Sequence, residues 1–222
     1  MARLRSLDPV AYVRYASVYR QFQEVDKLFE DSFRRSQYYL QLREKMDFLG
    51  EQLGKARSIE KEKLPEPLNQ FKLQYFPVLT ADGDQILFTK RDGTGNFDKE
   101  DIYTAFVKAD TGWTNPQSIA QSINSTYNEG TCTVTADGNI LIYTSCDAPD
   151  SQGSCDLYIA YKVNGAWQRP LNMGPKVNSR AWESQPSLSA DGRILFFSSN
   201  RKGGFGGNDI WYSVRQGDGT WA

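Results

Sequence analysis

The chain has 222 residues, and its 27 acidic and 26 basic side chains nearly cancel. That length allows one large domain or two small ones, and the balanced charge favours neither nucleic acid nor acidic lipid. No apolar run approaches the roughly 20 residues that span a bilayer. Histidine is absent, which excludes histidine-dependent nucleophiles, histidine-ligated zinc and imidazole acid–base chemistry. We therefore expect a non-enzymatic protein with no cofactor, no metal and no nucleic-acid partner.

Residues 1–63 are predicted to form a helical segment. Asp8 followed by Pro9 is a helix start, because an N-cap acid precedes a proline at the first helical position. Apolar residues then recur at three- and four-residue intervals in two runs with a break near 32–36, which predicts a helical hairpin. The runs are Tyr15, Val18, Phe22, Val25 and Phe29, then Tyr39, Leu42, Met46, Leu49, Leu53 and Ala56. Residues 64–67 contain two prolines and are the predicted linker. The helices serve either as a docking element or as packing for the neighbouring domain.

Part of this segment carries a family resemblance. The stretch that begins Asp8-Pro-Val-Ala-Tyr12 and ends Arg20-Gln-Phe-Gln-Glu-Val-Asp26 resembles the closing helices of an ATP-cone domain. That domain belongs to the bacterial repressor of ribonucleotide reductase genes. The family's zinc ribbon and basic nucleotide-binding segments are absent here, so the resemblance implies helix and transfers neither DNA nor ATP binding.

From Leu68 to Ala222 the sequence repeats three times. A Thr/Ser-Ala-Asp-Gly tetrapeptide recurs with its glycine at 83, 138 and 192. Each copy is followed by an apolar, aromatic-rich run and then by an Asp-apolar-aromatic triplet. The triplets begin at Asp101, Asp156 and Asp209, the repeats open at Asn69, Asn124 and Asn178, and they close at Trp113, Trp167 and Trp221.

The repeat has the features of an antiparallel sheet. Asp-Gly between two strand-like runs is a tight-hairpin signal, because both residues tolerate positive φ. A longer connection follows, then a strand that begins at the triplet and a fourth strand near the tryptophan, which together make a propeller blade. We therefore predict a mainly β fold, with three four-stranded WD40-like blades after the helical hairpin. The blades cover about 68–122, 123–176 and 177–222, and the tryptophans pack inside them.

The third copy shows which repeat family this is. Ser189-Ala-Asp-Gly-Arg-Ile-Leu-Phe-Phe-Ser198, followed by Asn208-Asp-Ile-Trp-Tyr212, resembles the WD40-like PD40 repeat. It is most similar to copies in Bacteroidetes envelope proteins that join helical repeats, a propeller and an OmpA-like domain, among them a type IX secretion and gliding component. The resemblance implies a periplasmic, outer-membrane-associated module with protein partners. Peptidoglycan binding does not carry over, because this chain has no OmpA-like domain. Its first residues also lack the apolar core of a signal peptide.

Cys146 and Cys155 lie at facing ends of two predicted strands in the second repeat. A disulfide there closes a loop of about ten residues and stabilises by roughly 2.5–3 kcal/mol. It favours export, whereas two free thiols would indicate a reducing compartment. No C-x-x-C pair is present, and Cys132 is predicted to be a small buried strand residue.

Two sets of polar residues occupy equivalent repeat positions. The triplet carboxylates Asp101, Asp156 and Asp209 are predicted to be structural, accepting hydrogen bonds within their own blade. Just before the innermost strand, the repeats carry a glutamine and two glutamates, which either line the mouth of the central channel as a binding site or anchor a loop. These residues are Gln74, Glu129 and Glu183.

Three blades do not close a propeller, which takes four to eight. We expect the remaining blades to come in cis, from a longer chain of which this is the front part, or from another subunit. The first functional hypothesis is a non-catalytic scaffold of the cell envelope. The alternative is the gating or substrate-binding propeller of a hydrolase whose catalytic domain lies elsewhere. The third is a cytoplasmic regulator derived from an ATP-cone protein.

Overall fold

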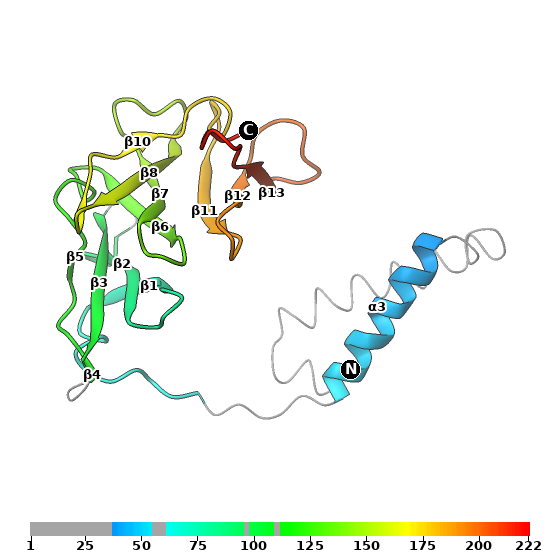
Figure 1. Cartoon of the computed structure of the whole chain (residues 1–222), viewed down its shortest axis with the longest axis horizontal. Coiled ribbons are helices and arrows are strands. Elements are labelled where there is room, and N and C mark those ends of the chain that lie inside the picture. Colours follow the sequence, from blue (N-terminus) through cyan, green and yellow to red (C-terminus); the bar gives the residue numbers. More distant parts are fainter. Residues whose placement is uncertain (1–36, 55–60, 96–97, 109–111) are drawn as a thin grey trace. The chain divides into compact units, whose positions relative to one another are not determined.

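The computed structural model describes residues 37–54, 61–95, 98–108 and 112–222. The chain divides into two units, Met1–Glu62 and Lys63–Ala222. The described residues are mainly β, as predicted, with one helix, α3 (Gln37–Gly54) (Figure 1).

Helix α3 lies in the first unit and covers most of the second predicted helical run. Its large apolar side chains Leu40, Phe48 and Leu49 are about half exposed, at 55%, 60% and 48%. Within the part of the chain that the structure describes, no helix is long and apolar enough to cross a membrane. The predicted first helix and the break at 32–36 lie outside the described residues.

The described part of the second unit forms three antiparallel sheets, one for each sequence repeat (Figure 1). The first sheet contains β1 (Leu73–Leu79), β2 (Gln85–Arg91), β3 (Glu100–Lys108), β4 (Gly112–Trp113) and β5 (Gln117–Ser118). The second contains β6 (Asn128–Val134), β7 (Ile140–Cys146), β8 (Cys155–Val163), β9 (Ala166–Trp167) and β10 (Leu171–Asn172). The third contains β11 (Glu183–Leu188), β12 (Ile194–Ser199) and β13 (Asp209–Val214). In each sheet the three long strands pair in chain order, so successive strands are neighbours.

The tetrapeptide forms the turn between the first two strands of every sheet. In the first repeat Gly83 has φ +75°, a conformation that glycine adopts without a Cβ penalty. The Asp82 carboxylate accepts from the Thr80 hydroxyl at 2.5 Å and from the Asp84 amide at 3.0 Å. The same hydroxyl accepts from the Gln85 amide at 3.1 Å, which fixes the start of β2. The other two turns repeat these contacts through Thr135 and Asp137, and through Ser189 and Asp191.

The first strand of every sheet is interrupted by a bulge at the same repeat position. The register shifts between Tyr75 and Val78 in β1, and two positive φ angles mark the site, +54° at Phe76 and +57° at Gln185. The corresponding shifts fall between Glu129 and Cys132 in β6 and between Ser184 and Ser187 in β11. A bulge bends its strand and increases the local twist, so the first strand of every sheet bends at the same repeat position.

The predicted fourth strand is present only in pieces. In the first sheet β4 and β5 both pair with β3, and in the second sheet β9 and β10 both pair with β8. Pro116 and Pro170 lie between these pieces. Proline has no amide hydrogen to donate to a ladder, so it divides the outer strand. In the third sheet the described residues supply only an isolated bridge between Arg215 and Trp221.

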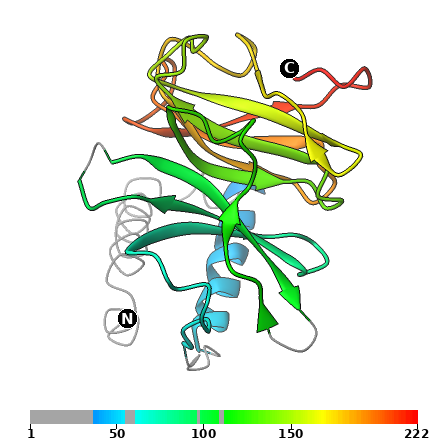
Figure 2. The ribbon, with the colours of Figure 1, turned by 90° about the vertical axis from the view of Figure 1, so that its left-hand side faces the viewer.

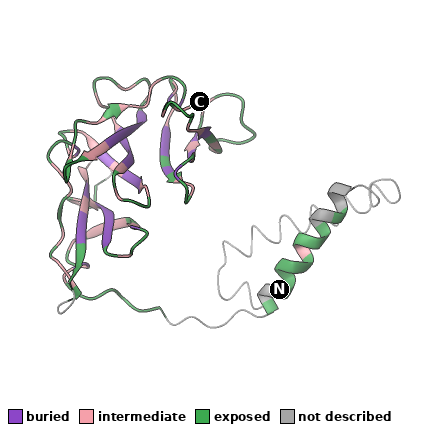
Figure 3. Cartoon of the chain, in the orientation of Figure 1, coloured by how far each residue is buried: buried purple, intermediate pink, exposed green. Residues whose placement is uncertain are grey.

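The second sheet is packed on both faces. One cluster joins its side chains to those of the first sheet, and another joins its opposite face to the third sheet. The first cluster includes Leu87 and Ile102 with Leu141, Tyr143 and Tyr158, and the second includes Ile142 and Leu157 with Leu195 and Phe197. Figure 2 shows the twisted strands from the side, and Figure 3 shows that buried residues follow the strands while exposed ones occupy many of the connections.

Candidate interaction site

Glu129 and Glu183 lie at the beginning of β6 and β11, and both carboxylates are buried, at 1% and 0% exposure. Glu129 accepts from the Ser125 amide at 3.0 Å and the Ser125 hydroxyl at 2.5 Å. Glu183 accepts from the Ser179 amide at 2.8 Å and the Ser179 hydroxyl at 2.7 Å. Each carboxylate therefore ties down the loop that precedes its strand, which is the loop-anchoring geometry. Binding at a channel mouth stays a prediction for these residues.

Gln74 holds the equivalent position in β1. Its side-chain oxygen accepts from the Phe71 amide at 3.3 Å, and its amide donates to the Asn69 side chain at 3.1 Å. The glutamine thus anchors the preceding loop in its own repeat without a charge.

The two glutamates differ in their neighbours. Arg201 Nη2 lies 3.2 Å from the Glu183 carboxylate. The equivalent residue in the second repeat is Asp147. Burial raises the pKa of Glu129 above its ordinary value. The hydrogen bonds from Ser125 act in the opposite direction but are outweighed by burial.

Two of the three triplet carboxylates, those of Asp156 and Asp209, hold the loops between the second and third strands of their sheets. Asp156 is fully buried and accepts from the amides of Gln152 at 2.8 Å and Gly153 at 3.1 Å, and from the Asn172 side chain at 2.7 Å. Asp209 accepts from the Gly206 amide at 3.1 Å. Asp101 pairs with Lys99 at 2.8 Å. In the described residues no group of three or more acidic or cysteine side chains is arranged to hold a metal ion.

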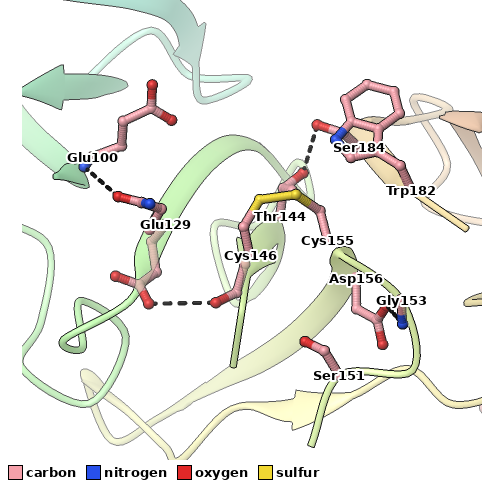
Figure 4. Close-up of a disulfide and its surroundings, with 12 residues drawn as sticks. Glu100, Glu129, Thr144, Cys146, Ser151, Gly153, Cys155, Asp156, Trp182 and Ser184 are labelled. Atoms are coloured by element: carbon pink, nitrogen blue, oxygen red, sulfur yellow. Dashed lines mark hydrogen bonds between the residues drawn. A yellow bond between two sulfur atoms is a disulfide. The ribbon is translucent and has the colours of Figure 1, made fainter. Parts of the chain in front are cut away.

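Cys146 and Cys155 form a disulfide in the structure, with their Sγ atoms 2.00 Å apart (Figure 4). They are directly opposed at the end of β7 and the beginning of β8. The bond closes the loop 147–154, and this loop rests against the segment before β11. A Cβ added at Gly153 would lie 1.8 Å from the main-chain oxygen of Ala181.

The third cysteine, Cys132, is free and buried, and burial raises the pKa of its thiol to about 12.

Asparagines join successive repeats, a role that the sequence did not reveal. Asn178 accepts from the Leu157 amide at 2.8 Å and donates to the Leu157 carbonyl at 2.9 Å, so its side chain pairs with the main chain of the preceding sheet. Asn124 makes the same pair of bonds to Ile102, at 2.9 and 2.8 Å. We call this arrangement the asparagine clasp. The signal available in the sequence was an amide at the same position of all three repeats, outside any predicted strand.

Hydroxyl side chains of the second sheet also form hydrogen bonds with the third sheet. Thr144 lies 3.2 Å from the Ser184 hydroxyl, as Figure 4 shows. Thr131 accepts from the Gln185 amide at 3.1 Å. These bonds use side chains of β6 and β7 to satisfy polar groups of β11 beside its bulge.

Comparisons with known proteins give short or weak likenesses. No family model matches the chain. Its N-terminal end is similar to the transcriptional repressor NrdR, with 64% identity over 31 residues to the protein of Heliobacterium modesticaldum, covering 14% of this chain and 20% of the relative. The Acidithiobacillus ferrooxidans repressor is 73% identical over 26 residues, 12% of this chain and 16% of the relative. The chain thus spans about a fifth or less of these curated relatives.

Among solved structures, a puromycin-hydrolyzing peptidase of Mycobacterium tuberculosis aligns at 12% identity and a TM-score of 0.44, over 65% of this chain and 22% of the peptidase. An α-L-arabinofuranosidase from Fusarium graminearum aligns at 13% identity and a TM-score of 0.34, over 59% of this chain and 40% of that one. Likenesses at this level assign neither fold nor function. The comparisons support the ATP-cone resemblance of the short N-terminal stretch.

Proposed function

We propose that residues 68–222 are three PD40-type propeller blades and that they form a non-catalytic protein-interaction module of the bacterial cell envelope, on the periplasmic side of the outer membrane. The repetition supports this proposal, because all three sheets share strand order, hairpin turn and bulge position. A blade also needs an outer fourth strand, and the divided β4–β5 and β9–β10 pieces occupy that place.

The observation that carries the proposal is that carboxylates and an amide of the repeat are buried and hydrogen-bonded within the chain. Glu129, Glu183 and Asp156 are at most 1% exposed and accept hydrogen bonds from their own chain. The same holds for Asn178, which is 1% exposed. These four side chains are thus committed to holding loops and sheets in place. A rigid sheet scaffold that presents loops is a common basis for binding other proteins.

The loops between the second and third strands are the surface that we assign to partners. The segment 147–154 is closed by the disulfide, and 200–208 carries Phe205, whose side chain is fully exposed among glycines. The disulfide also supports the periplasmic assignment, since such bonds persist in oxidising compartments.

Site-specific photo-crosslinking in the native envelope tests the proposal. A photoreactive side chain replaces Phe205, and in a matched control it replaces Val163, which is 50% exposed at the opposite end of a strand. We expect the first position to form an adduct with an envelope protein, and excess unlabelled chain to compete it away. Equal adducts at both positions, or no adduct at Phe205, would contradict the proposal.

A further inference from the structure

The third sheet carries two neighbouring arginines at the hairpin end of its strands. Arg193 directly precedes β12, and Arg215 directly follows β13. The Arg215 amide donates to the Arg193 carbonyl at 2.8 Å, so the two residues are joined through their main chains. Both line one groove of about 340 Å³, together with Gln216, Gly217 and Gly219. We call it the arginine groove.

The two guanidinium groups are unpaired. Among the residues that the structure describes, neither has a hydrogen-bond or ion-pair partner. The carboxylates of the two adjoining turns are held by those turns instead. Asp191 accepts from the Ser189 hydroxyl at 2.5 Å, and Asp218 accepts from the Thr220 hydroxyl at 2.7 Å. Two cations that line one groove without a paired counter-charge favour an anionic ligand.

The arginine pair is specific to the third repeat. The same main-chain bond of 2.8 Å joins the equivalent residues of the other repeats, which are Val107 and Asp84 in the first and Lys162 and Asn139 in the second. The cation of the second repeat is already engaged, because Lys162 Nζ lies 4.7 Å from the centre of the Trp167 ring. Arg215 has the matching main-chain bridge to Trp221. The sheets of the other two repeats form without an arginine pair, so the pair is not a requirement of the repeat's fold.

The position of the groove stays open when another sheet follows. The residues equivalent to Arg193 are exposed in the first two repeats, although each of those sheets packs against the next one; they are Asp84 and Asn139. Val107, the equivalent of Arg215 in the first repeat, is 44% exposed. After the closing tryptophan of the second repeat the chain runs back along β8, where Leu171 pairs with Ile159, away from the hairpin. Accessibility at this place is therefore a property of every repeat.

We propose that the arginine groove binds a compact dianion, either a phosphate group or a pair of neighbouring carboxylates. Planar guanidinium groups form paired hydrogen bonds with both kinds of group, and two of them match two negative charges. The glycines leave room for the ligand, since a Cβ added at Gly217 or Gly219 would meet nothing within 4 Å. No apolar side chain is among the lining residues, so the groove offers no platform for an aromatic or lipid group.

The anion site is independent of the partner surface proposed above. The arginine groove adjoins the first residue of β12, whereas the loop that carries Phe205 follows its last residue. The two surfaces therefore lie at opposite ends of one strand, and failure of either proposal leaves the other standing.

Isothermal titration calorimetry of the purified full chain tests the site, with inorganic phosphate and succinate as separate probes. The titrations are made at low ionic strength, because salt screens exposed charges. We expect saturable binding of at least one probe, at one site per chain. Tighter binding of phosphate assigns the groove to a phosphate group, and tighter binding of succinate assigns it to paired carboxylates. Absence of saturable binding for both probes overturns the inference.

Substitution of the arginines tests which side chains hold the anion. Arg193→Gln and Arg215→Gln should each raise the dissociation constant by about tenfold or more, because each removes charge-assisted hydrogen bonds. Lys162→Gln, at the equivalent position of the second repeat, removes the same charge and is the matched control. It should leave the constant unchanged. An equal effect of Lys162→Gln would mean that overall charge attracts the anion, and it would overturn the site.

Chemical labelling of the unsubstituted chain locates the anion independently. Phenylglyoxal modifies accessible arginines, and peptide mapping by mass spectrometry measures the rate at each one. The tighter probe should slow the modification of Arg193 and Arg215 and leave that of Arg169, an exposed arginine after the second repeat's tryptophan, unchanged. Equal protection of all three arginines, or protection of none, contradicts the proposed site.

Discussion

Replacement of Asn178 by alanine tests whether the asparagine clasp holds the repeats together. Asn178 is 1% exposed, and its side chain makes hydrogen bonds to the Leu157 amide, the Leu157 carbonyl and the Asn172 side chain, at 2.8, 2.9 and 2.8 Å. After the substitution the Leu157 carbonyl keeps a bond from the Met173 amide at 3.0 Å. The Leu157 amide loses its partner in a buried position. An orphaned buried donor costs about 1–3 kcal/mol, and the vacated volume adds to this cost.

We therefore expect Asn178→Ala to lower the free energy of unfolding by about 3 kcal/mol. Urea denaturation followed by tryptophan fluorescence measures it, with the slope compared between variants to check that the surface exposed on unfolding is unchanged. Asn124→Ala is the matched control. Its clasp to Ile102 has the same geometry, but Asn124 is partly exposed, so water replaces the lost partner and the cost falls to about 1 kcal/mol. Equal costs for the two variants, or less than about 0.5 kcal/mol for Asn178→Ala, would refute the reasoning.

Three further substitutions follow from the site. Joint replacement of Cys146 and Cys155 by serine should lower the free energy of unfolding by about 2.5–3 kcal/mol relative to the oxidised chain, and an unchanged urea midpoint would contradict the loop-closure argument. Because burial raises the pKa of Glu129 above its unfolded value of about 4.3, its contribution to stability is full below that pH and is lost as the pH rises through the folded pKa. Glu129→Gln should make the free energy of unfolding fall less steeply with pH when denaturation is measured from pH 4 to 7. If the free energy of unfolding of the variant falls with pH in parallel with that of the wild type, Glu129 is excluded as the source of the decline. Gly153→Ala places a Cβ against a main-chain oxygen at 1.8 Å and should cost about 1–3 kcal/mol, whereas Gly207→Ala, with nothing within 4 Å, should be nearly neutral in the same assay.

The turns and the disulfide were predictable because their determinants are local. The Thr80 hydroxyl, the Asp82 carboxylate and Gly83 shape one hairpin through contacts no more than five residues apart. Cys146 and Cys155 are separated by nine positions and face each other once that region forms a hairpin.

Contacts between sheets were not predictable in the same way. The Asn178 clasp joins residues 21 positions apart, and nothing in the local sequence indicates that an amide will pair with a neighbouring main chain. The fourth strand, predicted near the tryptophan of each repeat, is divided in the first two sheets because Pro116 and Pro170 have no amide hydrogen to donate to the ladder.

The clasp recognises main chain and not a particular side chain. Asn124 binds the amide and carbonyl of an isoleucine, and Asn178 binds those of a leucine. Both clasps therefore use the same two docking groups, the main-chain amide and carbonyl, although the residues that carry them differ. The clasp by itself therefore sets no requirement on the side chain at that position, and an exchange of isoleucine for leucine there leaves its two hydrogen bonds in place.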